Sequence, residues 1–210
     1  MIGFYDYTVV VTYISLVSSI LGMFCAIDGK LTLAVSCLAF SGLCDMFDGK
    51  IARTKKDRTD DEKSFGIQID SLCDIVCFGI FPIILGYKLG MCKLYSIVIL
   101  AFYGLAGVIR LAYFNVMEEE DQNRDESGAK IYTGLPVTSA ALIFPAVLLV
   151  HLLVRADLTF LYFGVMLITG ILFVSKIHIK KPENKGIATM IFFGAVECVV
   201  LIFALKFLKK

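Results

Sequence analysis

Long apolar runs constrain the fold of this chain more than any other feature of its sequence. A helix that crosses a bilayer needs about 20 mostly apolar residues. Runs of this length recur along the 210 residues and are separated by joints. We expect membrane segments at residues 7–27, 31–52, 65–88, 93–117, 134–154, 157–176 and 186–208. Because most joints are short, consecutive segments should pack antiparallel in a single domain over residues 1–210.

The composition supports a membrane protein and excludes several other classes. Hydrophobic residues make up 58% and charged residues 19% of the chain. Soluble domains have about 45–50% apolar and about 25% charged residues. We therefore expect an all-α, polytopic transmembrane helix bundle with a six-helix core and an additional C-terminal membrane segment. A disordered chain or a basic nucleic-acid-binding domain does not fit this composition, and no nucleic-acid partner is expected.

Three charged loops indicate how the chain is oriented. They cover residues 53–64, 118–133 and 176–185, and they fall on the same side if the first six segments alternate. Cytosolic loops of membrane proteins are rich in lysine and arginine, so this side and the N-terminus should be cytosolic. A seventh crossing would place the lysines near the C-terminus outside. The last segment, which contains Glu197, is therefore a span, a hairpin or an interfacial helix.

Four carboxylates lie in apolar runs where charges are costly. They are Asp45, Asp48, Asp70 and Asp74. Residues three or four apart share one face of a helix, so the first two form one stripe and the last two form another. Small residues continue these stripes, with Gly49 and Ala52 on the first and Gly66 on the second. Both stripes should meet near the cytosolic ends of adjacent antiparallel helices.

A pair of bound divalent metals explains four carboxylates at the edge of the hydrocarbon. Unpaired negative charges at that depth are unfavourable. Ligands that are all oxygen suit hard ions such as Mg²⁺, Mn²⁺ or Ca²⁺. Metal ions held by carboxylates often bind a substrate phosphate as well. The alternative is that these acids lie at the interface and pair with Lys50 and Arg53.

The pattern of these residues resembles a family signature. It reads Asp45-x-x-Asp48-Gly49-x-x-Ala52-Arg53, followed by Gly66-x-x-x-Asp70-x-x-x-Asp74. This is similar to the signature of the CDP-alcohol phosphatidyltransferases. Twelve residues separate Arg53 from Gly66, whereas the family usually has about eight or nine. An insertion of about one helical turn should leave both stripes intact but changes the loop beside them.

The resemblance implies a six-helix core, a homodimer and a site that opens to the cytosol. It implies transfer of a phosphatidyl group from CDP-diacylglycerol to an alcohol, with release of CMP and with two Mg²⁺ or Mn²⁺ ions, Ca²⁺ being an alternative. By position, Asp45, Asp48 and Asp70 would bind metal, and Asp74 would be the catalytic base while also touching a metal. The nucleotide pocket would contain Ser15, Asp45, Gly49, Ala52, Arg53 and Gly66. Ser15 stands where relatives usually have asparagine.

Three further stretches point to the acceptor alcohol. Residues 110–116, 133–136 and 175–178 resemble those of integral-membrane phosphatidylserine synthases, which implies L-serine. Arg110 lies inside an apolar run and should face the bundle interior, where it would bind the lipid phosphate or the serine carboxylate. Asn115 would hold the serine ammonium or hydroxyl group. The alternative for Arg110 is a structural counter-charge to one of the aspartates.

Three other functions compete with serine transfer. A glycerol phosphate or inositol phosphate acceptor should require more basic residues, and segments four and five offer only Arg110. A cation transporter would usually hold its ion near the bilayer midplane, whereas these acids lie near one interface. A scaffold without activity would not need all four aspartates.

Overall fold

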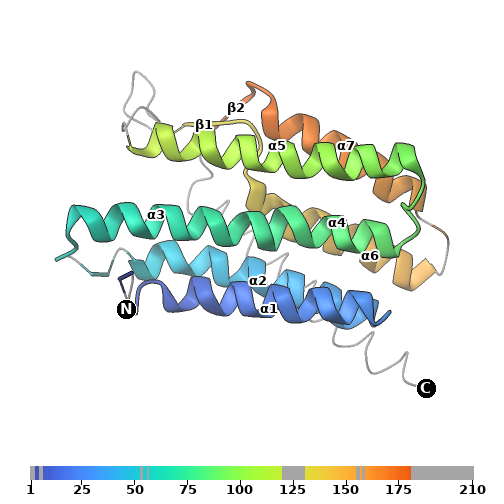
Figure 1. The fold of residues 1–210 in the computed structure, drawn as a ribbon, viewed down its shortest axis with the longest axis horizontal. Helices are drawn as coiled ribbons and strands as arrows, with labels where there is room; N and C mark the ends of the chain where they lie inside the picture. The colour runs from blue at the N-terminus through green and yellow to red at the C-terminus, as the bar shows by residue number, and fades with distance from the viewer. Residues whose placement is uncertain are drawn as a thin grey trace.

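The computed structural model describes residues 3–4, 7–52, 54–55, 57–119, 131–154, 157 and 159–180, which form a bundle of helices along one long axis (Figure 1). The helices are α1 (Val10–Ile27), α2 (Leu31–Ala52), α3 (Asp60–Asp74), η1 (Ile75–Ile80), α4 (Phe81–Lys88), α5 (Leu94–Glu119), η2 (Val137–Ser139), α6 (Ala140–Val154) and α7 (Thr159–Val174). Two short strands, β1 (Ile131–Thr133) and β2 (His178–Lys180), accompany them. The expected polytopic helix bundle is confirmed.

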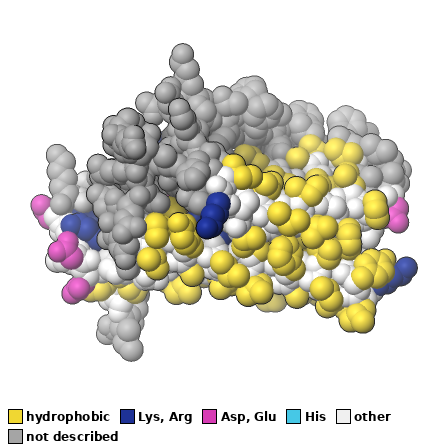
Figure 2. All heavy atoms as spheres, turned by 90° about the horizontal axis from the view of Figure 1, so that it is seen from above, with side chains coloured by type: hydrophobic (Ala, Val, Ile, Leu, Met, Phe, Trp, Pro, Cys, Tyr) yellow, Lys and Arg dark blue, Asp and Glu magenta, His cyan; other side chains and the backbone are white. Residues whose placement is uncertain are grey.

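The helices account for the six expected core segments. Four helical runs are long and apolar enough to cross a membrane, namely α1, α2, Asp60–Lys88 and Leu94–Met117. Two shorter apolar helices, Val137–Val150 and Thr159–Val174, follow. Hydrophobic side chains cover much of the flank seen in Figure 2, and the acidic side chains visible there lie toward its two ends. The seventh expected segment, 186–208, lies outside the described residues.

Helix α3 begins five residues before the expected start of the third segment, at Asp60 instead of Phe65. The reason is a capping box at Thr59. The Thr59 hydroxyl accepts the Glu62 backbone N–H at 3.2 Å, and the Glu62 carboxylate accepts the Thr59 N–H at 2.9 Å. Such reciprocal bonds satisfy two of the free N–H groups of a helix start. The charged turn 60–64, expected as loop, is therefore helical.

A π-helix, η1, follows Asp74 directly and separates α3 from α4. Pro82 has no N–H to donate to the carbonyl of Phe78, four residues earlier. The Tyr103 hydroxyl of α5 donates to that carbonyl instead, at 2.6 Å. The Tyr162 hydroxyl of α7 donates to the Pro82 carbonyl at 2.8 Å. Two buried tyrosines thus hydrogen-bond to the backbone at η1 and the start of α4, directly after Asp74.

Small and hydroxyl side chains allow α1 and α2 to pack closely. Ser15 donates to the Ser41 carbonyl at 3.1 Å, Ser41 donates back to the Ser15 carbonyl at 2.9 Å, and Ser19 donates to the Ser41 hydroxyl at 2.8 Å. Membrane helices commonly associate through such small polar residues. Across α2 and α6, a Cβ added at Gly42 would collide with Ala141. This packing fixes where the end of α2 stands relative to α1 and α6.

A two-stranded ladder joins the chain before α6 to the chain after α7. Ile131 pairs with Lys180 and Thr133 with His178 in antiparallel register. Gly134 follows with a φ of +80°, and a Cβ there would approach the Phe173 carbonyl oxygen to 2.9 Å. The ladder lies toward the same end of the bundle as the α2–α3 connection (Figure 1). The described parts of the three charged loops therefore share one end, as alternating helices require.

Candidate active site

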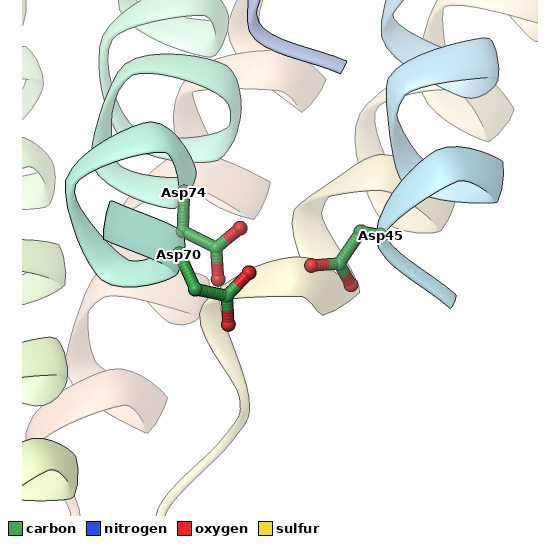
Figure 3. Close-up of side chains that lie close together, drawn as sticks. All are labelled: Asp45, Asp70 and Asp74. Carbon is green, nitrogen blue, oxygen red and sulfur yellow. The ribbon is translucent and has the colours of Figure 1, made fainter. Parts of the chain in front are cut away.

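Three aspartates from two helices converge inside the bundle. Asp45 extends from α2, and Asp70 and Asp74 extend from successive turns of α3 toward it (Figure 3). One carboxylate oxygen from each lies within 4.8 Å of the others. Asp74 is buried, with 8% of its surface exposed, whereas Asp45 and Asp70 are half-buried. The two helical stripes expected from the spacing therefore face each other.

The fourth aspartate, Asp48, lies beside this group and connects it to a third helix. Its side chain interacts with that of Asp70, and only 7% of its surface is exposed. The Thr12 hydroxyl of α1 donates to Asp48 Oδ2 at 3.2 Å. Sequence reasoning did not assign a role to Thr12. The available signal was its place in a run of hydroxyl residues along an otherwise apolar helix.

The small residues of the signature leave room around the carboxylates. A Cβ added at Gly49 would have no atom within 4 Å, and Gly49 is exposed. Ala52, at the end of α2, is half-buried. Gly66 differs, because an added Cβ would collide with the Arg58 guanidinium. Arg53, expected in the nucleotide pocket, lies outside the described residues.

The longer loop between α2 and α3 places Arg58 against Gly66. Arg58 Nη2 donates to the Glu62 carbonyl at 2.9 Å. Its Nε atom is buried and has no hydrogen-bond partner among the described residues. Lys55, also in this loop, binds the Glu62 carboxylate at 3.0 Å. The sequence indicates the longer loop, but the spacing alone does not single out Arg58 or Lys55 as a functional residue in it.

Asn115 of α5 contacts Ser71, the residue that follows Asp70 in α3. Its Oδ1 accepts a hydrogen bond from the Ser71 hydroxyl at 2.7 Å, and its Nδ2 donates to Gln68 Oε1 at 3.3 Å. These bonds tie α5 to the part of α3 that carries Asp70. The role expected for Asn115, binding of serine, stays a prediction.

Arg110 is buried inside the bundle, as expected, with 6% of its surface exposed. Its Nε donates to the Leu135 carbonyl at 3.2 Å, and its guanidinium lies 5.6 Å from the centre of the Phe114 ring. Arg110 thus links α5 to the segment that leads into α6. Its expected contact with a lipid phosphate or a serine carboxylate stays a prediction.

Ser15 is buried one helical turn beyond Thr12. Its hydroxyl donates to the Ser41 carbonyl and contacts the Cys77 sulfur at 3.7 Å. In this structure Thr12, rather than Ser15, contacts a signature aspartate. The expected contact of Ser15 with the nucleotide stays a prediction.

Of the two basic residues that could pair with the aspartates, only Lys50 lies among the described residues, and it is at the periphery. Lys50 is exposed, and its ammonium group lies 5.7 Å from the centre of the Phe47 ring. Lys176 is exposed, and the backbone of His178 lies in β2. The described residues also enclose a small cavity of about 30 Å³ beside Asp45, lined by Gly42, Thr138 and Ala141 among others.

The donor set fits a hard divalent cation. Three oxygens that lie close together on two rigid helices, with a fourth carboxylate adjacent, match the oxygen ligands that Mg²⁺, Mn²⁺ and Ca²⁺ prefer. Four carboxylates this close repel one another unless protons or cations neutralise them. The arrangement can therefore bind metal, and through metal the phosphate groups of a ligand.

Comparison with known proteins adds an independent finding. The family model for CDP-alcohol phosphatidyltransferase matches residues 8–177. An archaetidylserine synthase of Methanothermobacter thermautotrophicus is 30% identical over 82% of this chain and 68% of that protein. A CDP-diacylglycerol–serine O-phosphatidyltransferase of Helicobacter pylori is 28% identical over 82% of this chain and 70% of its own. The Saccharomyces cerevisiae protein of that name is 34% identical, over 49% of this chain and 37% of the yeast protein.

Proposed function

The chain belongs to the CDP-alcohol phosphatidyltransferase family, and we propose that it transfers the phosphatidyl group of CDP-diacylglycerol to L-serine, forming phosphatidylserine and CMP. The observation that carries this proposal is the convergence of Asp45, Asp70 and Asp74 between α2 and α3 of an apolar bundle. The choice of serine is supported by relatives named for serine transfer that align with 82% of this chain.

Two divalent ions, Mg²⁺ or Mn²⁺ with Ca²⁺ as an alternative, belong to this proposal. Asp45, Asp48 and Asp70 would hold them, with Asp74 in contact. Bound ions of this kind would neutralise the diphosphate and the charge that develops on it during displacement. Thr12 would fix the orientation of Asp48, since its hydroxyl occupies one of the Asp48 oxygens. Supporting bonds of this type keep ligand side chains in place.

Asp74 would act as the base in the transfer step. The serine hydroxyl oxygen forms a new bond to the phosphorus of the phosphatidyl group as the bond from that phosphorus to the CMP oxygen breaks. The hydroxyl proton passes to the Asp74 carboxylate, and CMP leaves with the electron pair. Asp74 suits this role because it is buried and its neighbours on two helices hold it in place.

The remaining contacts of the substrates are part of the same proposal. Gly49 and Ala52 would border the nucleotide, because both are small and a Cβ added at Gly49 would have no atom within 4 Å. Ser15, Arg53 and Gly66 would complete the nucleotide pocket. Arg110 would bind the lipid phosphate or the serine carboxylate, and Asn115 would bind the serine ammonium or hydroxyl group.

We further propose that the site faces the cytosol and that the protein acts as a homodimer within membrane lipid. The cytosolic orientation is supported by basic residues in the connection between α2 and α3, which include Lys55 and Arg58, and by Lys63 in the first turn of α3. Basic loops favour the cytosolic side. The aspartates lie on α2 and α3, the two helices that this connection joins.

The experiment is a transfer assay with the purified protein in detergent. CDP-diacylglycerol, Mn²⁺ or Mg²⁺, and labelled serine, glycerol phosphate or inositol phosphate are supplied separately, and CMP release and lipid labelling are measured. We expect CMP release that depends on serine and on the metal. Release with glycerol phosphate but not with serine would contradict the proposed acceptor. No CMP release with any acceptor would contradict the proposed reaction.

A further inference from the structure

We infer that Arg58, in the long loop between α2 and α3, is a binding residue for the diphosphate of the CDP-lipid. This inference rests on the proposed function. Arg58 lies outside the signature, and the signature contains no residue of this loop beyond Arg53.

The Arg58 guanidinium lies on the face of α3 that carries Asp70 and Asp74. It contacts the helix at Gly66, where an added Cβ would collide with Nη2 and would also lie 3.6 Å from the central guanidinium carbon. Gly66 and Asp70 are four residues apart, so they share a face and are separated by a rise of about 6 Å. A ligand anchored at Asp70 that extends by one turn therefore meets Arg58.

The hydrogen bonding of Arg58 is incomplete in a way that suits an anion. A guanidinium has five N–H donors in a planar fork. The structure uses Nη2 for the Glu62 carbonyl, while Nε is buried without a partner among the described residues. Buried donors without partners are rare and unfavourable. A guanidinium with unused N–H groups can donate to the oxygens of a bound diphosphate, and arginine is well matched to such groups.

The surrounding contacts distinguish Arg58 from the neighbouring described cations. Lys55 already binds Glu62. Lys63, in the first turn of α3, pairs with Asp60 at 2.9 Å, and 57% of its side chain is exposed. Arg58 instead contacts α3 at Gly66, on the face that carries Asp70. The absence of a side chain at Gly66 also makes room for the Arg58 guanidinium.

The test compares ligand binding by Arg58→Gln and by a matched control, Lys63→Gln. Both variants remove one positive charge within the same six residues, but Lys63 points to solvent. The purified proteins in detergent with Mn²⁺ are titrated with CDP and with cytidine by calorimetry. We expect Arg58→Gln to raise the dissociation constant for CDP about tenfold, the loss of one charge-assisted bond. Cytidine binding should be unchanged, and Lys63→Gln should bind both ligands as the wild type does.

Two results would overturn the inference while leaving the proposed function intact. One is wild-type CDP affinity in Arg58→Gln. The other is an equal loss of CDP and cytidine affinity, which would mean that Arg58 only supports the loop. If the wild-type protein transfers no phosphatidyl group and binds no CDP, both proposals fail together.

Discussion

The Thr12 hydroxyl of α1 donates a hydrogen bond to Asp48 Oδ2 of α2 at 3.2 Å, across 36 residues of sequence. Both side chains are buried, with 5% and 7% of their surfaces exposed. The Asp48 side chain also interacts with that of Asp70. Helix α1 is therefore connected to the site, although it supplies no carboxylate to it.

Replacing Thr12 by valine keeps the shape of the side chain and removes only this bond. We expect Thr12→Val to lower serine-dependent CMP release about tenfold, because supporting residues of metal ligands typically contribute 10–100-fold. Ser18→Ala is the control, since it removes a hydroxyl that donates to the Cys37 carbonyl between the same two helices. Equal effects of both variants on activity would show that Thr12 serves only helix packing.

Asp74→Asn should abolish turnover and leave CDP binding largely intact. The amide keeps the size of the side chain but cannot take up a proton from the acceptor hydroxyl. The measurements are CMP release and calorimetric titration with CDP in the presence of Mn²⁺. A variant that keeps near-normal rates would show that Asp74 is not the base.

Asp45→Asn should weaken metal binding. It removes one negative charge from the three carboxylates that lie within 4.8 Å, so the Mn²⁺ concentration for half-maximal activity should rise at least about tenfold. Direct binding is measured from the electron paramagnetic resonance signal of free Mn²⁺. Asp28→Asn is the control, because Asp28 pairs with Lys30 in an exposed turn. Unchanged Mn²⁺ binding in Asp45→Asn would argue against Asp45 as a ligand.

Tyr103→Phe should destabilise the protein by about 1–3 kcal/mol, because it leaves the buried Phe78 carbonyl without its donor. The loss should appear as a lower thermal midpoint in detergent. Since η1 follows Asp74 directly, we also expect a reduced rate. The comparison is Tyr162→Phe, which removes the bond to the Pro82 carbonyl further from the aspartates. A larger rate loss in Tyr162→Phe than in Tyr103→Phe would contradict this account.

The sequence predicts the parts of this molecule that depend on local periodicity. Apolar runs are long enough to locate six helices, and a spacing of three or four residues places each pair of aspartates on one face. Convergence of Asp45 with Asp70 and Asp74 follows from two antiparallel neighbours joined by one loop. No side-chain contact is needed for these conclusions.

The remaining features depend on contacts between residues that are far apart in the chain. Such contacts cannot be recognised from a single sequence. The bond from Thr12 to Asp48 requires the rotation of α1 about its axis. The π-helix requires Pro82 together with a tyrosine from another helix. The contact of Arg58 with Gly66 requires the path of the loop. Thr59 and Glu62 are capping residues that indicate a helix start at Asp60. The high charge of residues 60–64, however, is typical of a loop.

The ladder between β1 and β2 bears on how the short helices α6 and α7 fit a bilayer. Helices α6 and α7 contain 15 and 16 residues, fewer than a lone helix needs to cross the hydrocarbon. At their open end, Gly134 N–H donates to the Ile177 carbonyl at 2.7 Å, and Leu135 N–H donates to the carbonyl of Leu172 in the last turn of α7 at 3.1 Å. Polar backbone at membrane depth must be satisfied internally. Helices α6 and α7 therefore reach the edge of the hydrocarbon with these backbone groups already paired to each other.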